Sequence, residues 1–157
     1  MSRALMALML VVVVGAGAPL AAQAQNRPDF RRSTVTIEGK GGTHVFKVEM
    51  ATTPQELAFG LMFVRKLPVD QGMLLVYDPP EPASIWMKNT FIPLDIVFIS
   101  PNGRIESIRY GAKPHNLEAM TSKGTVGAVL ELNAGVVRIL GIGPGDLVRH
   151  KIFGNVK

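Results

Sequence analysis

Residues 84 to 100 read Ser-Ile-Trp-Met-Lys-Asn-Thr-Phe-Ile-Pro-Leu-Asp-Ile-Val-Phe-Ile-Ser. They include the single tryptophan of the chain, Trp86, and two short apolar runs that are bounded by prolines. Short runs of β-branched and aromatic residues with such boundaries are typical of β-strands. Lys88 and Asn89 therefore lie at the corner between two predicted strands, and corners of a rigid β scaffold often carry binding sites.

Further strands are predicted on both sides of this stretch. Apolar and β-branched runs predict them at residues 34–38, 45–50, 72–77, 104–110, 125–132 and 147–153. The run at 72–77 is apolar throughout, which is expected of a strand buried on both faces.

Turn residues indicate how these strands are connected. The glycine-rich segment 39–42 predicts a hairpin between the first two strands, and Asn102-Gly103 predicts a second, because both residues accept the positive φ angles of a tight turn. The proline-rich segment 78–82 is expected to lie outside the sheet, since proline cannot donate a ladder hydrogen bond. Residues 111–124 form the longest predicted loop.

Two short helices are predicted within this β pattern. Thr53 and Glu56 have the spacing of a capping box, which predicts a helix over residues 54–62. Asn133 is expected to cap a second helix over residues 134–140. The predicted fold class is therefore mainly β: a compact antiparallel or mixed β sandwich or barrel, with one helix after the first hairpin and a second short helix near the C-terminus.

The first 24 residues have the pattern of a secretory signal peptide. One arginine precedes an uncharged apolar run, and small residues follow up to the cleavage sequence Ala22-Gln23-Ala24. Glycines and a proline interrupt the run before it reaches the roughly 20 residues of a membrane-spanning helix. We expect residues 25–33 to form a flexible leader and residues 34–157 a single β-rich domain, periplasmic or secreted, with no stable membrane anchor after cleavage.

The composition excludes several classes of protein. The 157-residue chain has no cysteine, so disulfides, thiol nucleophiles and cysteine-ligated zinc are excluded. Its formal net charge of +5 is scattered along the sequence, which does not indicate binding to nucleic acid. The three histidines are dispersed, and the chain has no phosphate-loop or serine-hydrolase motif. We therefore predict neither a metal site nor a cofactor.

The candidate ligand-binding residues lie near strand ends. They are Trp86, Lys88, Asn89, Asp95 and Glu131. Strand alternation places Trp86 on one face with Lys88, and Met87 on the opposite face. An indole beside polar groups either stacks on a sugar ring or fills the core or rim of the domain.

The two carboxylates of this set require partners if they are buried. Asp95 alternates with apolar residues, so either Lys88 or the backbone N–H groups of residues 89–91 are expected to pair with it. The paired carboxylate is then either a structural clamp or part of a ligand site. If the strand end at Glu131 lies beside the corner, the polar side chains surround one depression that binds a polyol or performs acid–base chemistry.

Several spaced blocks occur along the sequence in a fixed order. They are Gly60-Leu61-Met62, Gly72-Met73-Leu74, Trp86-Met87-Lys88-Asn89-Thr90, Ile92-Pro93-Leu94-Asp95-Ile96, and Leu130-Glu131 followed by Gly135, Gly141 and Gly145-Asp146. Together they resemble the bacterial and archaeal family of domains of unknown function numbered 192. The resemblance covers nearly all of residues 34–153. It implies a compact, mostly β sandwich or barrel with short helices, frequent export and no established activity.

Two positions depart from this family pattern. Leu75 stands where many members have an aromatic residue, and Phe59 stands where an arginine often precedes the glycine. The second departure argues against any binding role that relies on a positive charge at that position.

These observations predict a binding or accessory module of the cell envelope, with a glycan or another polar ligand as its partner. One alternative is a hydrolase or lyase that acts on envelope polysaccharide with Asp95 and Glu131 as its carboxylates. Another is a protein-binding partner of an envelope assembly. An enzyme is distinguished from a binding module by Asp95→Asn, because this change abolishes turnover only in the enzyme.

Overall fold

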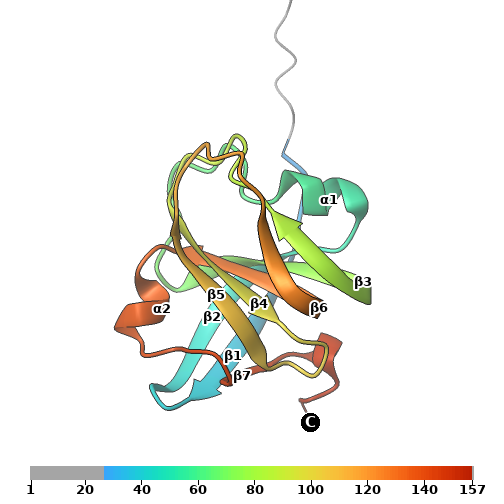
Figure 1. Cartoon of the computed structure of the whole chain (residues 1–157), viewed down its shortest axis with the longest axis vertical. Coiled ribbons are helices and arrows are strands. Elements are labelled where there is room, and N and C mark those ends of the chain that lie inside the picture. Colours follow the sequence, from blue (N-terminus) through green and yellow to red (C-terminus); the bar gives the residue numbers. More distant parts are fainter. Residues whose placement is uncertain (1–26, 157) are drawn as a thin grey trace, which may run out of the picture.

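The computed structural model describes residues 27–156, which form one curled sheet (Figure 1). Within this range, seven strands follow the spatial order β5-β4-β6-β3-β2-β1-β7. The strands are β1 (Arg31–Gly39), β2 (Gly42–Ala51), β3 (Gln71–Ile85), β4 (Leu94–Ile99), β5 (Ile105–Ala112), β6 (Met120–Asn133) and β7 (Leu147–Arg149). The helical segments are α1 (Pro54–Phe59), α2 (Val136–Ile139) and the 3-10 turn η1 (Lys151–Phe153).

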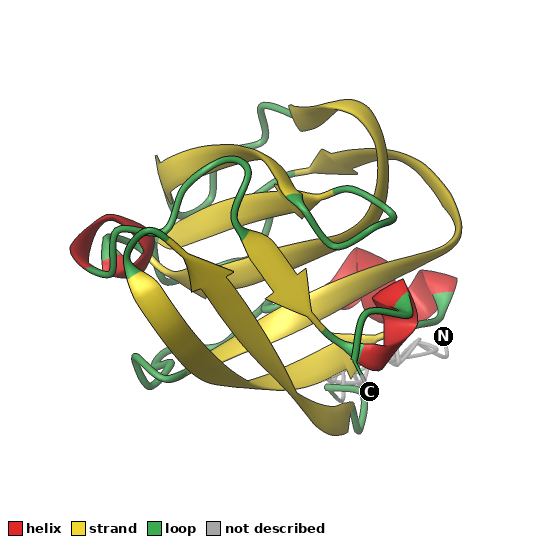
Figure 2. Cartoon of the chain, turned by 90° about the horizontal axis from the view of Figure 1, so that it is seen from below, coloured by secondary structure: helices red, strands yellow, loops and turns green. Residues whose placement is uncertain are grey.

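The strand pairing is mostly antiparallel. β1 and β2 form the predicted hairpin, and β4 pairs with β5 across the predicted Asn102-Gly103 turn. β2 and β3 are parallel, because the chain crosses over through α1 between them. Figure 2 shows the strands curling around, with the helical segments on the outside. The prediction of a mainly β, mixed sheet with two short helices is confirmed.

The start of the domain differs from the prediction. The proposed signal peptide, residues 1–24, lies outside the described residues. β1 begins at Arg31, so residues 31–33 of the predicted leader pair with β2. Phe30 precedes the strand and is 4% exposed, because its ring packs into a hydrophobic cluster and lies 6.4 Å from the ring of Phe59. No helix among residues 27–156 is long and apolar enough to cross a membrane.

β3 and β6 extend further than predicted. β3 includes the proline-rich segment 78–82, which was expected outside the sheet. Its pairing with β6 is interrupted between Val76 and Glu81 and then resumes. Such an irregularity allows prolines to lie within a strand, since the ladder is already broken there. Because β5 and β6 both extend toward it, the loop predicted at 111–124 covers only residues 113–119.

Helix α1 begins at the predicted capping box. The backbone N–H of Glu56 donates to the Thr53 hydroxyl at 3.3 Å, and the Glu56 carboxylate accepts from the Thr53 N–H at 3.0 Å. Hydrogen bonds from the Thr52 backbone, above all, lower the pKa of Glu56. The helix ends before Gly60, whose φ is +50°, and not near residue 62. Leu61 therefore packs from the following turn and is 3% exposed.

The sheet has an apolar core on each of its two faces. The first core receives side chains from all seven described strands, and its largest members include Phe46, Leu74 and Leu130. The second core, which includes Met73, Ile96 and Phe98, lies on the opposite face. Because neighbouring residues of a strand point to opposite faces, each polar residue near a strand end belongs to only one of these cores.

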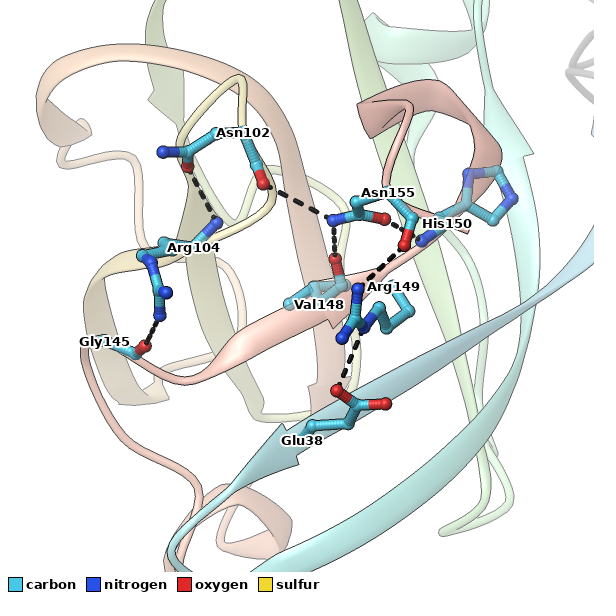
Figure 3. Close-up of polar contacts among 8 residues, drawn as sticks. All are labelled: Glu38, Asn102, Arg104, Gly145, Val148, Arg149, His150 and Asn155. Atoms are coloured by element: carbon cyan, nitrogen blue, oxygen red, sulfur yellow. Dashed lines mark hydrogen bonds and ion pairs between the residues drawn. The ribbon is translucent and has the colours of Figure 1, made fainter. Parts of the chain in front are cut away.

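A polar cluster near the C-terminus joins the two edges of the sheet (Figure 3). The Asn155 side chain donates to the Val148 carbonyl at 2.9 Å and accepts from the His150 N–H at 3.1 Å. Arg149 donates to Glu38 of β1 at 2.9 Å. The last strand was predicted to reach residue 153, but β7 ends at Arg149. The turn η1 follows, and the His150 ring caps it by accepting the Ile152 N–H at 3.3 Å.

Candidate functional site

A pocket of about 370 Å³ opens beside α1, on the face of the sheet that carries the second core. Its walls come from α1 and the turn that follows it, from β3, from the corner after β3, and from β6. We call it the Glu131 pocket, and its polar and aromatic lining includes Tyr77, Glu81, Ser84, Trp86, Lys88, Thr90 and Glu131. It therefore contains three of the five predicted site residues.

Glu131 contributes a buried carboxyl to this pocket. Its side chain lies between Met73 of β3 and Ile96 of β4, which are its partners on the neighbouring strands, and it is 5% exposed. The Oε2 atom has no hydrogen-bond partner among the described residues. Burial raises the pKa of Glu131 to about 7, because the charged form loses its hydration. The carboxyl therefore exchanges its proton nearer to neutral pH than an ordinary glutamate does.

Gly60 lies next to this carboxyl. A Cβ atom at position 60 would be 3.7 Å from Glu131 Oε2, so any longer side chain there would occupy the space beside the carboxyl. The φ angle of +50° also disfavours other residues at this helix end. The lack of a side chain at position 60 therefore leaves the space beside the Glu131 carboxyl unfilled.

Tyr77 and Glu81 are pocket residues that the sequence prediction missed. Burial, followed by the negative charges of Glu131 and Glu81, raises the pKa of Tyr77 to about 12. The Tyr77 hydroxyl thus lies within electrostatic range of both carboxyl groups and remains a neutral donor at physiological pH. Alternation along β3 was visible in the sequence, and it places Tyr77 on the same face as Met73. The sequence does not show, however, that Met73 pairs with Glu131.

Trp86 and Lys88 form the rim of the pocket. The predicted alternation is confirmed, because Ile85 and Met87 are buried while Trp86 is 48% exposed. Trp86 therefore occupies the rim and does not fill the core. The Lys88 ammonium lies 5.1 Å from the centre of the Trp86 ring, which is a cation–π distance.

Asn89 does not contribute to the lining of the Glu131 pocket. Its φ angle of +55° turns the chain at the corner, and its carbonyl accepts the Phe63 N–H at 2.8 Å. The side-chain amide lies 3.9 Å from the Met62 sulfur. Asn89 therefore joins the corner to the turn after α1, and its prediction as a ligand-binding residue receives no support from its position.

Asp95 lies on the opposite face of the sheet and is fully buried. One carboxylate oxygen accepts the Gly111 N–H at 2.9 Å. The other accepts the N–H groups of Gly135 at 2.9 Å and Val137 at 3.2 Å, at the start of α2. Asp95 thus joins β5 and α2 to the sheet, and these contacts are the ones expected of a structural clamp.

The partners predicted around Asp95 were wrong. Neither Lys88 nor residues 89–91 donate to this carboxylate; its donors come from distant segments. Asn133 was expected to cap the second helix, but its amide donates to the Leu67 carbonyl, and Asp95 binds the free N–H groups at the start of α2 instead. The helix is therefore capped by Asp95, a strand residue distant in the sequence, and not by its sequence neighbour Asn133.

The two predicted carboxylates do not form a catalytic pair. In the pairing of β4 with β6, Asp95 is opposite Leu132 and Ile96 is opposite Glu131. Because adjacent residues on a strand point to opposite faces, the sheet separates Asp95 from Glu131. The geometry therefore does not support the alternative of a hydrolase or lyase that uses both residues on one substrate.

Outside the Glu131 pocket, the pairing of Ser33 with His150 does not have the geometry of a nucleophile and its base. The Ser33 hydroxyl lies 2.8 Å from His150 Nε2, but His150 Nδ1 accepts the Ile152 N–H at 3.3 Å. Nε2 therefore carries the proton and donates to Ser33, so this histidine cannot remove the serine proton. Among residues 27–156, no three histidine or carboxylate side chains gather at a distance suited to a metal ion.

The family assignment follows from the match to a family profile. The DUF192 profile, described as Uncharacterized ACR, matches residues 34–150. The chain belongs to the DUF192 family. The resemblance indicated by the sequence blocks is thereby confirmed, and the matched region includes all seven described strands except the first residues of β1.

Two solved structures are similar to this DUF192 chain. One is a Sinorhizobium meliloti protein provisionally described as a transcription regulator, with 39% identity and a TM-score of 0.76; the match covers 78% of this chain and 96% of that one. The other is a Novosphingobium aromaticivorans protein of unknown function, with 37% identity and a TM-score of 0.76, covering 90% and 99% of the two chains. No curated protein matches the chain.

The DUF192 domain brings separate sequence blocks together at the Glu131 pocket. Residues from Gly60-Leu61-Met62, from the block that starts at Trp86, and from Leu130-Glu131 all line it. Phe59, which replaces the arginine expected at its position, lines it as well, so that wall is apolar in this chain. The site is thus a cavity in which polar groups and apolar side chains contribute about equally to the lining.

Proposed function

We propose that this DUF192 domain is a binding module for a small polyhydroxylated ligand, such as a sugar unit of a glycan. The observation that carries the proposal is the buried Glu131 carboxyl, which lines an open pocket while its Oε2 atom lacks a partner among the described residues. A buried polar atom without a hydrogen bond costs about 1–3 kcal/mol. A ligand hydroxyl that pairs with this carboxyl group would offset that cost.

The other groups of the Glu131 pocket suit the same ligand. Sugars combine hydroxyl groups around the ring edge with an apolar ring face. Tyr77 and Glu81 supply a donor and an acceptor along one wall of the pocket, and Trp86 supplies an exposed indole at its rim. Polar groups that converge beside apolar and aromatic side chains are typical of small-molecule sites.

The single tryptophan makes ligand binding directly measurable. We expect a sugar that enters the pocket to change the Trp86 fluorescence, and we expect Glu131→Gln to weaken the affinity about tenfold through loss of one strong hydrogen bond. The measurement is a fluorescence titration of the folded domain with hexoses, N-acetylhexosamines and uronic acids.

A matched control is available at a second exposed aromatic residue. Tyr110 is 40% exposed and lies beneath Arg138 at 4.2 Å, outside the pocket, so it resembles Trp86 with Lys88. Tyr110→Ala is expected to bind the sugar with unchanged affinity. An affinity that is the same in the parent and in Glu131→Gln would contradict the proposed site.

We also propose that the domain is exported, because residues 1–24 have the pattern of a signal peptide. Cleavage is expected between Ala24 and Gln25, where small residues fit the peptidase. The intact mass of the exported protein tests this proposal. A mature chain that still contains the apolar run of residues 4–14 would contradict it.

A further inference from the structure

We propose that the Glu131 pocket selects cationic polyols: its ligand carries a primary amine, as amino sugars do, and places the ammonium group against Glu131. This inference rests on the proposed function and names the ligand class of the same site. It follows from how charge is distributed between the interior of the pocket and its rim.

The pocket is lined by two carboxyl groups. Glu131 lines it from β6 and is buried, and Glu81 lines it from β3 at an exposed position. The negative charges of both residues add to burial in raising the pKa of Tyr77. Among the described residues that line the pocket, Lys88 is the single cation, and it lies at the rim against the Trp86 indole. An ammonium group entering the pocket therefore meets two carboxyl groups, whereas an anionic ligand meets like charge.

The side chains next to Glu131 on the neighbouring strands cannot pair with its carboxylate. Met73 and Ile96 flank it from β3 and β4 and are apolar. The titratable groups on the elements packed around it are Tyr77 and Glu81 on β3, Glu56 on α1, which is occupied in the capping box, and Lys88 at the corner after β3. Asp95 on β4 points to the opposite face.

An ammonium group offsets the cost of the buried Glu131 carboxylate better than a hydroxyl group does. A hydroxyl supplies one neutral hydrogen bond, whereas an ammonium supplies a charge-assisted bond and offsets the charge of a carboxylate that has been removed from water. When the ammonium binds, the protonated carboxyl of Glu131 loses its proton to solvent and the carboxylate pairs with the ligand. The ligand itself is not chemically changed.

The residues at the rim of the pocket also affect how strongly an amine is expected to bind. The Trp86 indole already faces an ammonium, that of Lys88, at 5.1 Å. Lys88 is of like charge to the proposed ligand and competes for the indole face. Removing this side chain is therefore expected to strengthen the binding of an amine and to have little effect on a neutral polyol.

A matched pair of probes tests the inference: sorbitol, and 1-amino-1-deoxysorbitol, which differs by one ammonium group in place of a hydroxyl. At pH 8, Trp86 fluorescence titrations are expected to give an affinity for the amine that is at least about tenfold higher than the affinity for sorbitol.

The pH dependence is a second test of the same inference. Because Glu131 must be ionised, the affinity for the amine should fall about tenfold per pH unit once the pH is below the pKa of about 7, while the affinity for sorbitol does not fall. Calorimetry at pH 6, in two buffers of different ionisation heat, should detect the proton that Glu131 releases when the amine binds.

Variants separate the inference from the proposed function. Glu131→Gln should remove the preference for the amine, Lys88→Ala should increase it, and Tyr110→Ala should leave it unchanged. If sorbitol and neutral sugars bind the parent as tightly as the amine at pH 8, the inference is overturned and the proposed function stands. If neither the amine nor any neutral polyol binds, both are overturned.

Discussion

Asp95→Asn is expected to lower the free energy of unfolding by about 3 kcal/mol, since hydrogen bonds to a charged group contribute about 1.5–3 kcal/mol each. The Asp95 carboxylate is fully buried and accepts the N–H groups of Gly111, Gly135 and Val137 on its two oxygens. Asparagine offers one oxygen, and its NH₂ group must then face a backbone donor. At least one buried N–H group loses its acceptor, and the start of α2 loses its cap.

Urea unfolding measures this loss, and the melting temperature should fall by on the order of 10 °C for a domain of this size. Asp70→Asn is the control, because its carboxylate is 54% exposed and pairs with Lys47 at 3.4 Å; it should cost less than about 1 kcal/mol. Sugar binding by folded Asp95→Asn should match the parent, since the carboxylate faces away from the Glu131 pocket. Equal small losses for both variants would show that Asp95 is not the clamp.

Glu131→Gln is expected to do the opposite and raise the stability of the domain at alkaline pH. The pKa of Glu131 rises from an ordinary 4.5 to about 7 in the folded protein, so between these values the folded state binds more protons than the unfolded state. Stability must then fall as the pH rises through this window, by about 3 kcal/mol in total. Below pH 4.5 the carboxyl is protonated in both states and the penalty is absent.

Urea unfolding at pH 5 and pH 8 tests this dependence. The parent should lose about 2–3 kcal/mol between the two pH values through Glu131, and Glu131→Gln should not show this part of the decrease. Glu118→Gln, at an exposed position, is the control and should change stability by less than about 0.5 kcal/mol. A variant that is more stable but binds more weakly would mark Glu131 as a group retained for ligand binding. Loss of stability in Glu131→Gln at pH 8 would contradict the unpaired carboxylate.

Features that depend on neighbours in the sequence were predictable. The capping box at Thr53 and Glu56, the hairpin at Asn102-Gly103 and the alternation around Trp86 are confirmed, because each is decided by residues within a few positions of one another. The end of α1 was missed by three residues. Gly60 takes a positive φ angle there, and the sequence does not distinguish a helical glycine from a terminating one.

The predicted site failed where it depended on which strands become neighbours. Trp86 and Lys88 follow from local alternation, and the structure places Glu131 in the same pocket. Tyr77 and Glu81 were missed because their approach to Glu131 requires the pairing of β3 with β6, including the interruption before Glu81. Such long-range pairing leaves no local pattern in the sequence.

The sequence by itself determined the β-rich class, the positions of the turns, the absence of disulfides and the membership of the DUF192 family, since composition and short-range patterns decide these properties. The tertiary structure decided which face of the sheet each carboxylate occupies. The register of β4 on β6 places Ile96 beside Glu131 and thereby turns Asp95 to the opposite core. A shift of one residue would exchange the two faces, and only the packing of both cores selects between these registers.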